Sequence, residues 1–334
     1  MKKGRRYNAF SINLGDDGGK TKLLCPVDKC LEVYSTKGIY QIYPPESLDP
    51  KETNPDMPAM SKKVSDIGTS NWIVARIMVQ NYQIINSHGF LSQEMKITFT
   101  THLRDIMNAI LTCNEICNAI TERVSEVEKQ VISKGLKSKG NVFTHFPTIN
   151  GLDEKTTLYL TKAKHCIQRT IDIFNIFYES PITNPRIDKL IQWSDTNGIA
   201  TYVVDTLKHF EPIAKYIVDL RNAQEHPDEK ARFVFSDFTI LANGEISAPL
   251  WGINEAKHSI HKEMDVLIKE LVVFVEWLVI NLVLSKEKKN PLFELRVFQI
   301  PDKQMDLDCP IKYRVETCFK QDSKHRVARR DERT

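Results

Sequence analysis

Apolar residues recur every three or four positions through the middle of the chain, which is the spacing of one face of an α-helix. The pattern predicts helices over residues 72–85, 92–131, 153–178, 184–193, 200–209, 212–226 and 254–284. Pro212 suits the first turn of a helix, where its missing N–H group has no bond to lose, and Pro227 is expected to end that helix. The last helix is apolar on two sides, which indicates a position in the centre of a bundle or between subunits.

Shorter segments instead show the alternation that is typical of strands. The predicted strands cover residues 10–14, 22–25, 232–241, 245–250, 292–300 and 311–319. Asn243-Gly244 joins the middle pair and is a strong hairpin signal, while the run Gly15-Asp16-Asp17-Gly18-Gly19 separates the first pair. We expect the strands at the two ends of the sequence to pair into one small sheet.

Five prolines among polar residues between positions 43 and 60 indicate an extended connector, and therefore a boundary. The sequence predicts a β-rich segment with this connector over 1–60, a helical bundle over 61–290 with a hairpin near 231–251, and strands with a charged tail over 291–334. The predicted fold class is mainly α: a helical bundle with an inserted β-hairpin and short β-rich N- and C-terminal segments.

The 334 residues are 41% hydrophobic and 27% charged, as in globular proteins, and the net charge of +3 tolerates a nucleic-acid partner without requiring one. No sustained apolar run follows the first basic residues, so no signal peptide is expected. The apolar stretch 271–284 is too short for a membrane span and contains Glu276. We therefore expect a cytoplasmic protein that does not associate with membranes.

Seven cysteines without a C-x-x-C pair favour reduced thiols. Cys25, Cys30, Cys309 and Cys318 could assemble a zinc site, but ordinary burial is the favoured interpretation. Neither a metal ion nor a cofactor is expected.

The segment Arg221-Asn222-Ala223-Gln224-Glu225-His226 carries the clearest chemistry in the chain. Arginine keeps its charge at neutral pH and can stabilise an anion, whereas histidine can accept or donate a proton. Residues five apart lie about 140° apart on a helix, so Arg221 and His226 would not share a face unless the helix ended between them. Pro227 loosens the helix end at His226. The pair is suited to metal-free cleavage of an RNA phosphodiester.

Arg221-Asn222-x-x-x-His226, at the end of one predicted helix and before another, resembles the motif of the HEPN superfamily. The resemblance implies a helical bundle, formation of a homodimer that brings two motifs together, and activity as a metal-independent endoribonuclease. It also implies a role in antiviral defence or as a toxin, with RNA as substrate and an antitoxin or effector protein as partner. In this interpretation Arg221 binds the scissile phosphate, His226 is the general base or acid, and Asn222 orients the pair.

Two alternatives remain for the motif. One is a non-catalytic HEPN-like module that binds RNA, nucleotide or a partner protein, as other members of that superfamily do. The other is an unrelated helical scaffold in which Arg221 and His226 only finish a helix.

A second group of polar residues is expected in the first turns of the last helix. Lys257, His258, His261 and Lys262 are candidates for contacts to the RNA backbone. The two histidines could also be metal ligands, but an ordinary solvent-exposed position is the favoured interpretation for them. The doubly apolar helix that follows is the expected dimer surface.

Overall fold

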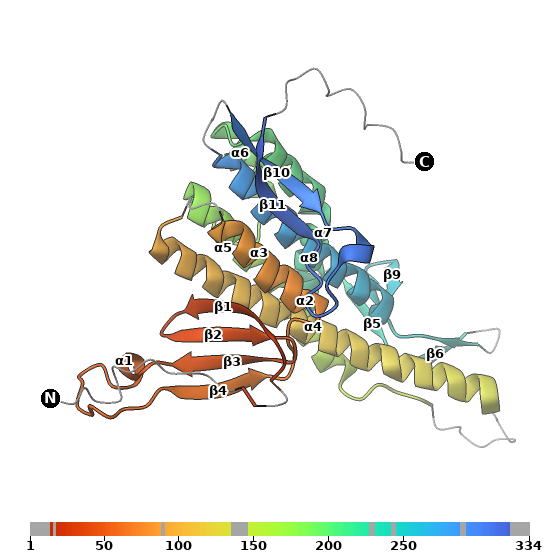
Figure 1. Cartoon of the computed structure of the whole chain (residues 1–334). Helices are drawn as coiled ribbons and strands as arrows, with labels where there is room; N and C mark the ends of the chain where they lie inside the picture. The colour runs from red at the N-terminus through yellow and green to blue at the C-terminus, as the bar shows by residue number, and fades with distance from the viewer. Residues whose placement is uncertain are drawn as a thin grey trace, which may run out of the picture.

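The computed structural model describes residues 14–15, 18–87, 91–134, 146–226, 231–241, 245–287 and 292–320. Within these residues the chain is mainly helical, with four small antiparallel sheets arranged around the helices (Figure 1). Its mainly α character agrees with the apolar spacing along the sequence. Among the described residues, no helix has both the length and the apolar character that crossing a membrane requires.

Two long helices match the predicted ranges closely. These are α4 (Gln93–Lys134) and α5 (Leu152–Tyr178), which lie side by side. They pack with α7 (Thr201–Glu225) and α8 (Ile260–Ser285), and the shorter α6 (Ile187–Thr196) packs on α7. With 42 residues, α4 is about 63 Å long, and its C-terminal end extends past the other helices (Figure 1).

Helix α8 is central to this arrangement. It contacts α4, α5, α7 and the short helix α3 (Asn81–Asn86), and apolar residues are buried on both of its sides. Val266 is the only large hydrophobic residue of α8 that remains exposed. The second apolar side, expected to serve a dimer interface, is therefore used within the chain.

Helix α7 runs through Pro212 without interruption, so the prediction that a new helix begins there is wrong. A proline inside a helix loses one hydrogen bond and costs about 3 kcal/mol. Apolar residues on both sides of Pro212 form one continuous buried face against α5 and α8, which offsets this cost. They are Val203, Leu207, Phe210, Ala214, Ile217 and Leu220.

The N-terminal sheet is an antiparallel meander. It consists of β1 (Thr21–Val27), β2 (Cys30–Ser35), β3 (Gly38–Tyr43) and β4 (Met60–Ser65), and β1 lies against α4. Of the strand predicted over 10–14, only Leu14 is among the described residues. The proline-rich connector contains α1 (Pro45–Leu48) and joins β3 to its neighbour β4. The boundary expected after residue 60 therefore falls within β4.

Two small sheets lie between α7 and α8 in the sequence. The first is a short hairpin of β6 (Thr239–Ile240) and β7 (Ile246–Ser247), whose predicted turn at Asn243-Gly244 lies outside the described residues. The second contains β5 (Phe233–Ser236), β8 (Leu250–Ile253) and β9 (Ala256–Ser259) in the order β5-β8-β9. Because β9 pairs with β8, α8 begins at Ile260 and not near residue 254 as predicted.

The two strands predicted near the end of the chain are confirmed as β10 (Phe293–Gln299) and β11 (Tyr313–Phe319). They pair with each other, and in the described part of the chain neither pairs with the N-terminal sheet, contrary to expectation. The loop between them, which includes a 3-10 turn at Asp302–Gln304, meets the N-terminal region instead. Lys22 Nζ lies 2.8 Å from Asp306 Oδ2, and the Thr69 hydroxyl donates to the carbonyl oxygen of Asp308 at 2.8 Å. The charged tail over 321–334 lies outside the described residues.

The helix predicted over 72–85 contains a π-helical segment. It comprises α2 (Trp72–Val74), the π-helix η2 (Ala75–Gln80) and α3. From η2, Arg76 Nε donates at 2.7 Å and Gln80 Nε2 at 2.9 Å to the carboxylate of Glu276, which is completely buried on α8. The amide oxygen of Gln80 accepts from the backbone N–H groups of Lys312 and Tyr313. This polar network ties η2, α8 and β11 together.

Candidate functional site

The candidate motif occupies the last turn of α7 and the residue after it. The helix ends at Glu225, and the backbone N–H of His226 donates to the carbonyl oxygen of Asn222 at 2.8 Å. His226 has left the helical conformation, with φ −133° and ψ 68°. Pro227 lies outside the described residues. The motif thus lies at the C-terminal end of α7.

Arg221 is fixed against α5 and against its own helix. Its Nε donates to the Thr161 hydroxyl at 3.1 Å, and its Nη2 lies 2.5 Å from Oε1 of Glu225. Gln224, between them, accepts from Arg221 Nη1 at 3.5 Å and donates to Thr157 at 2.8 Å. Only 13% of the arginine side chain is exposed. The guanidinium therefore has a defined position, but a carboxylate already occupies one side of it.

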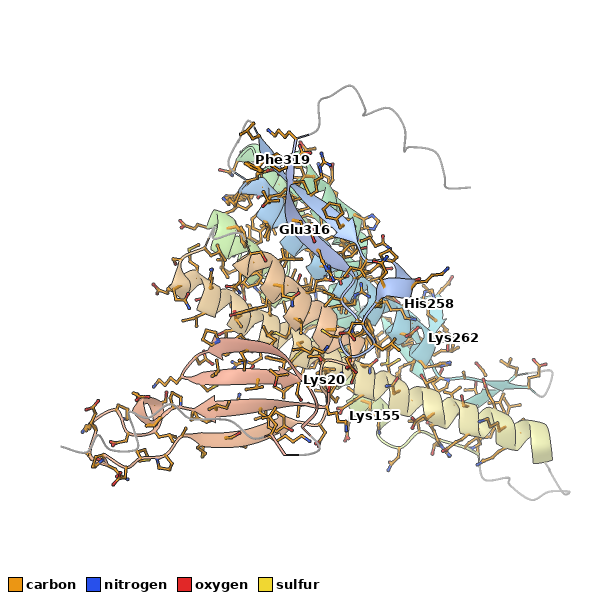
Figure 2. All side chains as sticks on the ribbon, viewed as in Figure 1. Lys20, Lys155, His258, Lys262, Glu316 and Phe319 are labelled. Carbon is orange, nitrogen blue, oxygen red and sulfur yellow. The ribbon has the colours of Figure 1, made fainter. Side chains whose placement is uncertain are left out.

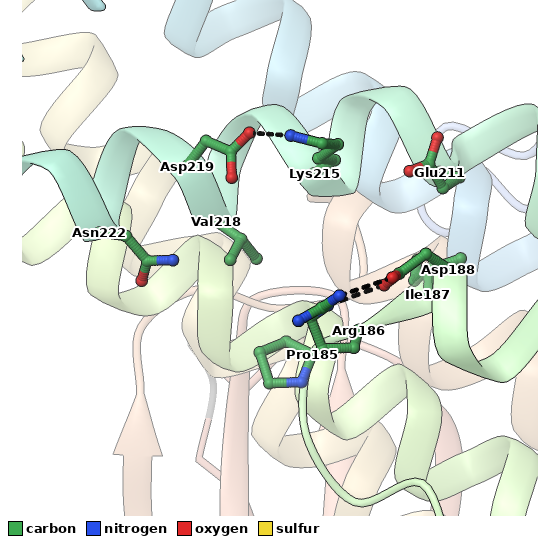
Figure 3. A pocket seen from close by; sticks show the side chains of 9 residues that line it. All are labelled: Pro185, Arg186, Ile187, Asp188, Glu211, Lys215, Val218, Asp219 and Asn222. Atoms are coloured by element: carbon green, nitrogen blue, oxygen red, sulfur yellow. Dashed lines mark hydrogen bonds and ion pairs between the residues drawn. The ribbon is translucent and has the colours of Figure 1, made fainter. Parts of the chain in front are cut away.

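Asn222 lies beside a second cation from α5. Lys164 Nζ donates to Oδ1 of Asn222 at 3.2 Å, one helical turn after Thr161. Asn222 also lines a cavity of about 290 Å³ between α7 and the start of α6. Figure 3 shows both cations of that cavity paired with a carboxylate, Arg186 with Asp188 and Lys215 with Asp219, and the carboxylate of Glu211 also lines the cavity. Because these cations are paired, the cavity has no free positive charge to attract an anion.

His226 is exposed, and no side-chain hydrogen bond or ion pair joins it to Arg221 or Asn222 among the described residues. The structure therefore brings Arg221 and Asn222 together beside Thr161 and Lys164 of α5, whereas the imidazole of His226 is exposed and has no side-chain partner among the described residues. An exposed imidazole can accept a proton from a ligand without first breaking an internal bond.

The four residues expected to contact RNA from the last helix belong to two elements. Lys257 and His258 lie in β9, whereas His261 and Lys262 lie in the first turn of α8, so the prediction of one shared helical surface is wrong. Figure 2 labels one residue of each element, His258 of β9 and Lys262 of α8. The His261 ring lies 3.1 Å from the Ser259 hydroxyl, and burial, together with the charge of Lys262, lowers its pKa.

His258 takes part in a cluster around Glu263 of α8 that the sequence did not indicate. The Glu263 carboxylate accepts from the Tyr216 hydroxyl at 3.0 Å and from the indole N–H of Trp251, and it lies 3.8 Å from Nδ1 of His258. Burial and the nearby carboxylate raise the pKa of Tyr216, so its hydroxyl stays protonated and donates. The cluster attaches the β5-β8-β9 sheet to α7 and α8 close to the motif.

The cysteines considered for zinc do not form such a site. Cys25, Cys30 and Cys309 are buried, and burial is the main cause of their raised pKa values, which for Cys309 reaches about 11. Cys318 lies on β11 opposite Glu294. Within the described residues no group of three or more histidine, cysteine or acidic side chains could hold a metal ion. Thiols that stay protonated are poor metal ligands.

Sequence analysis missed several residues of the site. Thr161 and Lys164 lie about sixty positions before the motif, and only the packing of α5 on α7 brings them to it. Glu225 could have been found, because its spacing of four residues from Arg221 is the spacing of a helical ion pair.

Comparisons with known proteins give no assignment. No protein-family model matches the chain, and no curated protein or solved structure is significantly similar to it.

Proposed function

We propose that this protein is a metal-independent endoribonuclease of the HEPN type. The observation that carries the proposal is the geometry at the end of α7: Arg221 is held against α5, and an exposed imidazole follows at the first residue beyond the helix. The packing of α4, α5, α7 and α8 is compatible with the helical bundle of that superfamily. The small sheets would be an insertion between the motif and the last bundle helix.

The proposed reaction joins the ribose 2′ oxygen to phosphorus and breaks the bond from phosphorus to the 5′ oxygen. His226 takes the proton of the 2′-hydroxyl, and a second, protonated histidine gives a proton to the departing 5′ oxygen. Arg221 stabilises the charge that develops on the phosphate oxygens, and Asn222 orients the group. Lys164 supplies a further positive charge beside Asn222. The products are a 2′,3′-cyclic phosphate and a 5′-hydroxyl.

A homodimer would supply the second histidine. Because α8 is buried within the chain, the dimer surface would instead be the C-terminal end of α7 with the neighbouring sheet. A two-fold axis there would bring two arginines and two histidines to one groove. The cytoplasmic location, the role in defence or as a toxin, and an antitoxin or effector partner belong to this proposal through the resemblance alone.

A non-catalytic RNA-binding module is the second candidate. It is favoured by the ion pair between Arg221 and Glu225, which neutralises the cation that should hold the phosphate. In that case binding of RNA would not lead to cleavage.

Cleavage assays with Arg221→Ala and His226→Ala variants test the proposal. The wild type should cut RNA in excess chelator and leave cyclic phosphate ends, and each variant should lose the activity while keeping its fold. His209→Ala, which removes another exposed histidine from α7, is the matched control and should cut normally. Absence of cleavage by the wild type on a broad set of RNAs, or persistence of cleavage in His226→Ala, would contradict the proposal.

A further inference from the structure

An open cavity of about 660 Å³ lies at one end of the β5-β8-β9 sheet. Its wall includes Arg232 and Phe233 at the start of β5, the turn residue Glu255, and Lys257 of β9. Arg232 is six residues after His226, and six residues span at most about 20 Å. A nucleic-acid strand that contacts the motif can therefore also reach this cavity.

Two aromatic rings form part of this wall. Phe233 and Phe235 are two apart on β5, so both project from the same face of the strand. Their ring centroids are 6.2 Å apart with an angle of 21° between the planes, and both residues are half-buried. Nearly parallel rings in fixed positions are suited to stacking against the bases of a single strand.

The cations of the wall differ from three of the cations near the motif. Arg221, Lys215 and Arg186 each have a carboxylate partner. Arg232 and Lys257 are exposed, and neither has a carboxylate partner within the described part of the chain. With Glu255 included, the described residues of the wall carry one net positive charge. Unpaired cations beside aromatic rings match the alternation of phosphates and bases in a nucleic-acid strand.

We infer that this cavity binds single-stranded RNA on its way to the motif. A base stacks on Phe233 or Phe235, and Arg232 and Lys257 contact the flanking phosphates. The inference rests on the proposed function for the identity of the ligand. It assigns Lys257 to phosphate binding and leaves His258 as a support of the sheet, through Glu263. A base in a duplex has no free face to stack on the rings, so the site selects unpaired RNA.

Binding of a fluorescently labelled RNA of about 12 nucleotides tests this assignment. The RNA carries 2′-O-methyl groups throughout, so it cannot be cleaved, and the full chain is used. The double variant Arg232→Gln/Lys257→Gln should bind more weakly. The slope of log affinity against log salt should fall by about 0.7 for each cation removed. Glu255→Gln should bind more tightly, because it removes the one negative charge among the described residues of the wall.

The aromatic contribution is tested separately with Phe233→Leu/Phe235→Leu, which keeps apolar side chains against the core. Loss of base stacking should weaken binding about five-fold or more without changing the salt slope. Lys29→Gln/Lys303→Gln removes two exposed cations from the β1–β2 turn and from the 3-10 turn at Asp302–Gln304, and it is the matched control. Thermal unfolding shows whether each variant is folded.

Equal binding by the Arg232/Lys257 variant and the Lys29/Lys303 control would overturn the inference. Equal affinity for a duplex of the same sequence, or for an acidic peptide of similar length, would also overturn it. His226→Ala separates this inference from the proposed function, since it should abolish cleavage and leave binding intact. If the wild type binds RNA here but never cuts it, the binding site stands and the nuclease proposal fails.

Discussion

Glu225 holds the guanidinium of Arg221. The two side chains belong to the last turn of α7, and Nη2 of the arginine lies 2.5 Å from Oε1 of the glutamate. The arginine is 13% exposed and the glutamate 37% exposed, so the carboxylate covers the cation from the solvent side. Any phosphate that binds Arg221 must displace this carboxylate or share the guanidinium with it. Under the proposed function, the Glu225 carboxylate would therefore compete with an RNA phosphate for Arg221.

Replacing Glu225 by glutamine should strengthen RNA binding. An ion pair whose carboxylate is 37% exposed contributes about 0.3–1 kcal/mol, which corresponds to a two- to five-fold fall in Kd. The measurement is the Kd of a non-cleavable RNA at moderate salt. Asp219→Asn is the control, because it breaks the neighbouring i,i+4 pair with Lys215 on the same helix. An equal gain from Asp219→Asn would show a general charge effect and not competition at Arg221.

Thr161 should act by positioning Arg221, since its hydroxyl accepts from Nε at 3.1 Å. Thr161→Val keeps the shape of the side chain and removes this acceptor. We expect kcat to fall by about ten-fold with little change in KM, because the guanidinium would lose its alignment with the transition state. Thr161→Ser should restore the rate. A merely structural role would instead lower the melting temperature without separating kcat from KM.

The cluster around Glu263 should determine how firmly the β5-β8-β9 sheet is attached. Glu263→Ala leaves the Tyr216 hydroxyl and the Trp251 indole without their acceptor. One buried and one partly buried donor without partners should cost about 2–4 kcal/mol in the free energy of unfolding, measured with urea. Glu255→Ala, on the exposed turn of the same sheet, should change it by less than about 0.5 kcal/mol. Similar losses in both variants would exclude this role for the cluster.

Glu276 should be indispensable for the fold although it makes no contact with the motif. Removing its charge in Glu276→Gln leaves Arg76 partly buried without a counterion, at a cost of about 3–5 kcal/mol. The double variant Arg76→Met/Glu276→Met should recover much of this loss, because it removes both charges together. Unfolding free energies of the single and double variants give the comparison. A double variant no more stable than the single one would show that the hydrogen bonds to Gln80 matter more than charge.

Stability should decrease below about pH 6.5 because of histidines that stay neutral in the fold. Burial lowers the pKa of His102, beside Asp105, Arg169 and Asp172, and burial likewise lowers the pKa of His165. Below the ordinary value of 6.5 the unfolded chain binds more protons than the folded chain, so unfolding becomes more favourable as pH falls. The loss levels off below the folded pKa. His102→Gln should flatten this part of the profile of melting temperature against pH, and an unchanged profile would exclude His102 as its source.

The long helices could be predicted because their apolar spacing is uninterrupted. Buried residues of α4 such as Leu103, Ile106, Ile110 and Cys113 follow one face of the helix, and no proline or glycine breaks the pattern. The continuity of α7 through Pro212 could not be predicted in this way. A proline locally indicates the start of a helix, whereas the packing of α7 on α5 and α8 stabilises one continuous helix. The strand Ala256–Ser259 is too short to show alternation, and its pairing with β8 is visible only in the fold.

Only the part of the candidate site that is formed by residues close together in the sequence could be predicted. Arg221, Asn222 and His226 lie within six residues, so their chemistry can be read directly. Lys164 meets Asn222 across two packed helices, and Glu263 receives hydrogen bonds from α7 and β8. Contacts between distant segments leave no periodic signal in a single sequence. For the same reason the expected pairing of the two terminal strand regions was wrong, since the loop between β10 and β11 contacts Lys22 of β1 and Thr69 through side chains instead.

The hydrogen bonds of Gln80 join two segments of the chain that are synthesised at very different times. Its amide oxygen receives the N–H groups of Lys312 and Tyr313, which a ribosome adds more than two hundred residues later. Until those residues are made, the buried amide oxygen of Gln80 lacks these two N–H donors, and the core of the nascent chain is incomplete. A premature stop codon before residue 312 would therefore release a polypeptide with an incomplete core, even though α7 and its motif would already have been translated.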